Sequence, residues 1–151
     1  MNNTLTEARA QARAGRLAQW VQAFLREEGG EHANPNVALA DGLLLEERFY
    51  LGPVRIALGM LETVRVEADI PDAAERARYD HIVDQMAEAI PDWDMPPFIV
   101  EYRDGRLILT DGNHRFSALR RLGADRCEVI VWGAAAREAE ARARISAGWT
   151  P

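Results

Sequence analysis

Lysine is absent from this sequence of 151 residues, and all 18 basic residues are arginines. Without lysine, the chain cannot form a P-loop lysine site, a Schiff base with a carbonyl substrate, or a lysine general base. Any anion that it binds must therefore be held by arginine, by backbone N–H groups or by a bound metal ion.

Cysteine and long apolar runs are almost as scarce. Cys127 is the one cysteine, which excludes an internal disulfide and a cysteine metal cage, and favours a reducing, cytoplasmic setting. No apolar run approaches the roughly 20 residues that span a bilayer. The first residues lack the apolar segment of a secretory signal, so we expect neither secretion nor a membrane partner.

Basic charge is also in deficit, because the net charge is −6. Non-specific affinity for DNA comes from neutralising phosphates, so we do not expect this chain alone to bind DNA. Hydrophobic residues make up 48% of the chain, which is enough to bury the core of a single domain.

The spacing of apolar residues in the first half of the chain predicts two helices and, between them in the sequence, one strand. Residues 4–28 repeat apolar side chains at helical spacing, and Gly29-Gly30 would end that helix. We expect a loop over 31–42, make no assignment for 43–51, and expect a strand over 53–58 followed by a short helical turn at 59–64. Asp72 and Glu75 have the spacing of a capping box at the start of a helix over 73–90.

The second half predicts a hairpin, a short helix and a further strand. Residues 98–102 and 106–110 alternate around Asp104-Gly105, a typical two-residue hairpin turn. The pattern then predicts a helix over 114–122, a strand over 127–132 and a polar helix over 134–147. The fold class is therefore α/β of the α+β kind, a small mixed sheet with a β-hairpin and flanking helices.

The turn between the second hairpin strand and the next helix carries the chemistry. Gly112 would let the chain turn and let a ligand approach closely, and Asn113 would cap the helix. His114 and Arg115 would join the free N–H groups of the helix start in an anion site for which phosphate is the natural occupant. Asp111 could orient Arg115, hold a magnesium ion or act as a general base. The plainer alternative is a capped turn with a solvated arginine.

The segment "PPFIVEYRDGRLILTDGNHRFSALRRLG" resembles the N-terminal domain of the ParB/sulfiredoxin superfamily. The family's phosphate motif is a glycine, two variable residues, an arginine, two variable residues and an alanine; here it corresponds to Gly112, Arg115 and Ala118. The resemblance extends over about residues 52–132. It implies a single domain over 1–151, with an N-terminal helical extension (1–50), this core and a C-terminal helix (134–151).

The resemblance also implies a function. ParB-type members bind and hydrolyse CTP, sulfiredoxins use ATP to repair an oxidised cysteine, and a related serine kinase transfers phosphate to a small molecule. A nucleoside triphosphate, ATP or CTP with or without magnesium, is the expected cofactor, and Gly112, Asn113, His114 and Arg115 are the expected binding residues. Asp111 is the candidate catalytic residue, and no resident metal site is expected.

Three departures from the family narrow these expectations. Asn113-His114 replaces the glutamate-arginine pair usual in partition ParB proteins. Asn113 also occupies the position of the sulfiredoxin catalytic cysteine, so we expect no sulfiredoxin activity. The 19 residues after Trp132 are too few for the helix-turn-helix domain of partition proteins. The main expectation is a nucleotide-binding domain, either an NTPase or a small-molecule phosphotransferase. The alternatives are a non-catalytic interaction module, a homodimer or a DNA-associated protein that acts with a partner.

Overall fold

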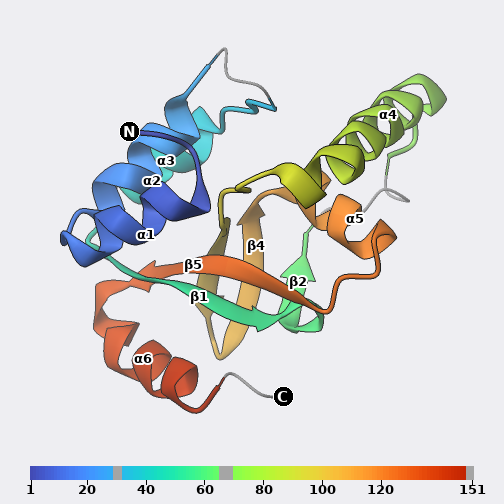
Figure 1. Cartoon of the computed structure of the whole chain (residues 1–151). Helices are drawn as coiled ribbons and strands as arrows, with labels where there is room; N and C mark the ends of the chain where they lie inside the picture. Colours follow the sequence, from blue (N-terminus) through green and yellow to red (C-terminus); the bar gives the residue numbers. More distant parts are fainter. Residues whose placement is uncertain (29–31, 65–69, 149–151) are drawn as a thin grey trace.

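The fold is a mixed five-stranded sheet with helices on both faces (Figure 1), seen in a computed structural model that describes residues 1–28, 32–64 and 70–148. The strands lie in the order β1-β5-β3-β4-β2. The strand bounds are β1 Arg48–Ala57, β2 Leu61–Thr63, β3 Phe98–Arg103, β4 Arg106–Asp111 and β5 Arg126–Ala134. β5 pairs antiparallel with β1 and parallel with β3, while β4 pairs antiparallel with β3 and parallel with β2. The predicted α+β class is confirmed.

The hairpin prediction is confirmed. β3 and β4 pair through Arg103 and Arg106, and the two residues between them have positive φ angles, 52° for Asp104 and 77° for Gly105. Two consecutive positive φ angles define the type I′ turn, whose twist matches that of the paired strands. The helical turn expected at 59–64 is shorter: residues 58–60 form one 3₁₀ turn, and β2 follows directly.

The single helix predicted over 4–28 is wrong. The chain forms α1 (Leu5–Arg13) and α2 (Leu17–Arg26) instead. Gly15 stands between them with a φ of 75°, the left-handed conformation with which glycine commonly ends a helix. The end predicted at Gly29-Gly30 falls at residues outside the described part of the chain.

The loop predicted over 31–42 is also wrong. It contains α3 (Val37–Leu43), and the Asn36 side chain caps this helix by accepting a hydrogen bond from the Leu39 N–H at 3.1 Å. Asparagine is among the best residues for this role, because its side-chain oxygen satisfies a free N–H of the first turn.

The remaining helices agree closely with prediction. They are α4 (Ala73–Ala89), α5 (Asn113–Arg121) and α6 (Glu138–Ser146). The Asp72 side chain caps α4 by accepting a hydrogen bond from the N–H of Ala74. Among the described helices, none combines the length and apolar character that crossing a membrane requires.

The two faces of the sheet bury separate cores, because successive strand residues point to opposite sides. Ile99, Ile130 and Trp132 pack with α1, α2 and α3 on one face. Phe98, Val100, Val129 and other residues pack with α5 and α6 on the other. In Figure 1, α1 to α3 accordingly gather on one side of the sheet, while α4 and α5 lie together elsewhere.

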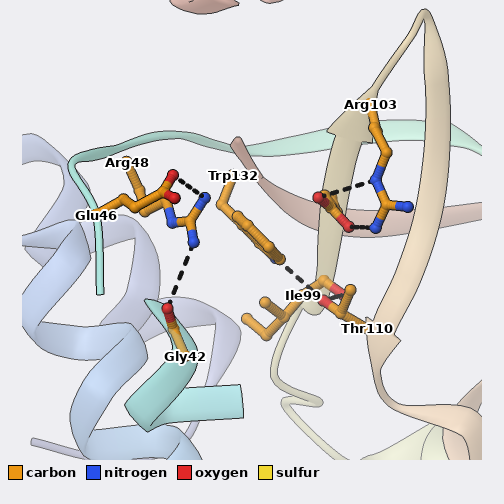
Figure 2. Close-up of polar contacts among 8 residues, drawn as sticks. Gly42, Glu46, Arg48, Ile99, Arg103, Thr110 and Trp132 are labelled. Atoms are coloured by element: carbon orange, nitrogen blue, oxygen red, sulfur yellow. Dashed lines mark hydrogen bonds and ion pairs between the residues drawn. The ribbon is translucent and has the colours of Figure 1, made fainter. Parts of the chain in front are cut away.

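A chain of hydrogen bonds fixes the end of β4, the strand that leads into the candidate site (Figure 2). The Trp132 indole Nε1–H donates to the Thr110 hydroxyl at 3.1 Å, and that hydroxyl donates to the Ile99 carbonyl at 2.9 Å. The Arg48 guanidinium lies over the Trp132 ring, 5.3 Å from its centroid. These contacts tie β3, β4 and β5 together one residue before Asp111.

Candidate functional site

The start of α5 is shaped by Gly112. Its φ of 116° lies in a region that side chains rarely adopt, and a Cβ added there would lie 2.4 Å from Phe98 Cδ1. Gly112 is the residue that precedes the first turn, and no side chain caps the helix. The prediction that Asn113 is the cap is therefore wrong, because Asn113 is already the first helical residue. The first N–H groups of α5 have no partner within the helix.

Arg115 is buried rather than solvated, with 7% of its side chain exposed. Its Nη1 donates to the carbonyls of Pro96 and Pro97, and its Nη2 donates to Asp111 Oδ2 at 3.2 Å. The guanidinium also lies 5.0 Å from the centroid of the Phe98 ring and 5.5 Å from that of Phe24. The solvated-arginine alternative is thus wrong, and Arg115 holds the connector before β3 against the start of α5.

Asp111 completes a buried ion pair with Arg115. Burial raises the pKa of the Asp111 carboxyl above its usual range, and the Arg115 charge and a hydrogen bond from Asn36 oppose that shift. Burial likewise lowers the pKa of Arg115, with Asp111 opposing. Desolvation penalises both charges, and each charge compensates the other. Catalysis by Asp111 stays a prediction, and in this structure the carboxylate orients Arg115.

A cavity of about 220 Å³ opens at this ion pair. Asp111, Gly112, His114 and Arg115 form one wall. The facing walls come from α2, from α4 and from connecting segments, and they include Phe24, Leu25, Glu27, His32, Met86 and Trp93. The structure therefore brings four of the five predicted site residues into one cavity.

Asn113 is the predicted residue that lies elsewhere. It lines a second cavity on the α4 side of α5, together with Tyr79, Arg78 and Glu75. Its backbone carbonyl accepts a hydrogen bond from the Tyr79 hydroxyl at 3.1 Å. His114 lines both cavities and packs on the Tyr79 ring, with ring centroids 4.5 Å apart. The His114 side chain therefore lies between the two cavities.

Sequence reasoning missed the aromatic walls that the N-terminal half contributes. Phe24 follows the apolar stripe of α2, which indicates only a core position, yet its ring reaches Arg115. His32 packs on Trp93 with ring centroids 4.8 Å apart, although these residues are 61 positions apart in the sequence. The one available signal in the sequence was Trp93, an aromatic residue close to the prolines of the connector before β3.

The hydrogen-bond donors at this site suit an anion, and the carboxylates of Asp111 and Glu27 line the same cavity. Helix N–H groups, an imidazole and a guanidinium all donate hydrogen bonds. Among the residues that the structure describes, no group of three or more histidine, cysteine, aspartate or glutamate side chains is arranged to hold a metal ion.

Comparison with known proteins gives matches to solved structures alone, since neither protein-family models nor curated proteins match the chain. Sulfiredoxin from Arabidopsis thaliana is similar to 52% of this chain and 81% of its own, with 19% identity and a TM-score of 0.42. A conserved hypothetical protein from Pyrococcus furiosus has 19% identity and a TM-score of 0.39, with 52% and 31% covered. The pNOB8-like ParB N-domain has 16% identity and a TM-score of 0.39, with 59% and 30% covered. This chain therefore spans about a third of the length of the last two, and the structures that it resembles include both a sulfiredoxin and a ParB N-domain.

Proposed function

We propose that this chain binds the phosphate groups of a nucleoside triphosphate at the start of α5. The observation that carries the proposal is the uncapped start of that helix, which opens at Gly112 into the cavity that His114 and Arg115 line. Backbone N–H groups at a helix start attract anions, because they are free to donate and the helix dipole is positive there.

His114 supplies the side-chain contact in this proposal. Arg115 already donates to two carbonyls and to Asp111, so most of its five donors are engaged and its charge is balanced. His114 stands at the helix start without being buried. Its imidazole adds a hydrogen-bond donor for a phosphate and a positive charge when protonated.

In this proposal, the base of the nucleotide lies against the aromatic side of the same cavity. Phe24, His32 and Trp93 line this side of the cavity, and stacking of a base on an aromatic ring contributes about 1–3 kcal/mol. The volume of about 220 Å³ is below the roughly 300–1,000 Å³ of drug-sized pockets. Part of a bound triphosphate would therefore extend into solvent. Magnesium, if it accompanies the nucleotide, would be held chiefly by the phosphates.

Calorimetric titration with ATP, CTP and inorganic triphosphate, each with and without magnesium, tests the proposal. We expect His114→Ala to weaken binding by about tenfold, the loss of one charge-assisted hydrogen bond. His81→Ala is the matched control, because His81 is exposed on α4 and lies outside the cavity; it should bind like the parent. The proposal fails if no triphosphate binds, or if His114→Ala and His81→Ala bind equally well.

A second candidate function, a protein-interaction module, is favoured by two adjacent leucines. Leu44 and Leu45 follow α3 and are 66% and 82% exposed. Leu44→Ser and Leu45→Ser should abolish any self-association seen by sedimentation if these residues form a contact, whereas the nucleotide site would be unaffected.

A further inference from the structure

A separate cavity of about 270 Å³ lies where β5 begins, on the other side of the connector from the phosphate cavity. Its walls are largely apolar, formed by Leu5, Ile90, Met95, Leu119 and neighbouring residues. Trp93 and Pro96 line both cavities, so the connector forms a wall that the two share.

Two arginines stand together at this cavity. In the pairing of β1 with β5, Arg55 lies opposite Glu128, and Arg126 precedes Glu128 by two residues on the same face of the sheet. Arg55 and Arg126 are both exposed and line the cavity. Like charges on neighbouring strand positions repel one another, and the Glu128 carboxylate opposite Arg55 offsets part of that repulsion.

The acidic groups of the cavity are already engaged by α1. Glu128 accepts from Arg9 at 3.1 Å, and the Asp94 carboxylate accepts from the Thr6 N–H at the start of α1, at 3.3 Å. Within the described residues, no carboxylate lies within ion-pair distance of Arg55 or Arg126. These two guanidinium groups thus present positive charge beside an apolar space in a chain of net charge −6.

We infer that this cavity binds a small organic carboxylate with an apolar body. A guanidinium matches the planar carboxylate and can bind it through two parallel hydrogen bonds. The apolar walls would cover the body of the ligand, as in most small-molecule sites. The inference does not depend on nucleotide binding, since neither arginine lines the phosphate cavity.

Three probes separate the charge from the apolar body: phenylacetate carries both, phenylacetamide the body alone and acetate the charge alone. Each is titrated into the full chain while NMR follows the Trp93 indole and the Arg126 amide. We expect phenylacetate to shift both signals and to bind at least tenfold more tightly than either other probe. Arg55→Ala and Arg126→Ala should each weaken phenylacetate by about tenfold.

Arg137→Ala is the matched control, because Arg137 is exposed and lies outside this cavity; it should bind phenylacetate like the parent. If phenylacetamide and phenylacetate bind equally well, the arginine charges do not contribute to binding, and the inference is overturned. If acetate binds as tightly as phenylacetate, the apolar walls do not contribute to binding, and the inference is overturned as well. The absence of any shift at Trp93 and Arg126 would also overturn it.

Discussion

The dipeptide Asp-Gly occurs twice within nine residues and serves two different purposes. Asp104-Gly105 closes the hairpin, where a Cβ added to Gly105 would meet only the Arg144 side chain, at 3.6 Å. Asp111-Gly112 directly precedes α5, where the carboxylate is buried against Arg115 and a Cβ added to the glycine would lie 2.4 Å from the Phe98 ring. The first turn needs glycine for its backbone conformation alone. The second needs it for conformation and for space.

Removing the Arg115 side chain should have the largest effect on the second turn. Arg115→Ala leaves the Asp111 carboxylate buried without its partner and frees the carbonyls of Pro96 and Pro97. Breaking a buried ion pair in this way costs about 3–5 kcal/mol of unfolding free energy. Urea denaturation measures that loss. Arg103→Ala, which removes an exposed ion pair at the hairpin, should cost less than about 1 kcal/mol.

A double-variant cycle sharpens this result. Asp111→Ala should lower the free energy of unfolding much less in the Arg115→Ala background than in the parent chain. In that background the substitution removes a buried carboxylate that has already lost its ion-pair partner. Strict additivity of the two losses would show that the pair does not act as a unit.

Gly112→Ala should rank second. The positive φ alone costs about 1–3 kcal/mol for a residue with a side chain, and the Phe98 ring must also move. Gly105→Ala should cost about 1 kcal/mol, since only the backbone term applies. Thermal unfolding of both variants measures the stability that each one loses. Equal losses of stability at the two glycines would mean that the Phe98 ring moves aside at little energetic cost.

The smallest expected effect is the pH dependence that Asp111 confers. Because burial raises its folded-state pKa above 3.8, the folded state holds this proton more tightly than the unfolded state. The resulting stabilisation is complete below the unfolded-state pKa and is lost as pH rises through the folded-state pKa. Asp111→Asn should flatten this decline in urea denaturation series across acidic pH. A steeper loss of stability with rising pH in the variant would contradict the assigned direction of the Asp111 pKa shift.

Local patterns were sufficient to predict the elements that depend on near neighbours. The hairpin around Asp104-Gly105, helix α4 after Asp72 and strand β5 lie close to where spacing and turn residues put them. The break at Gly15 was missed, because the apolar stripe continues on both sides of it. The cap at Asn36 was missed because "NPN" also fits an ordinary turn.

The sequence was sufficient to predict which segment forms the site, but not the three-dimensional cavity in which it lies. Turn chemistry identified residues 111–115, and four of these residues share one cavity. The burial of Arg115 depends on the carbonyls of Pro96 and Pro97, which arrive from another part of the chain. No local pattern encodes such a contact. The same holds for Phe24 and His32, which reach the site only after α1, α2 and α3 pack on the sheet.

The order of the strands has a consequence for how the chain matures during its synthesis. Of the five described strands, β5 is the last to leave the ribosome, yet it lies between β1 and β3 and joins them. Until it emerges, β1 has no neighbour in the sheet, and the hairpin of β3 and β4 has just the short strand β2 beside it. A nascent chain stalled before residue 126 should therefore remain open to proteases, and protection should appear abruptly once residue 134 has cleared the exit tunnel.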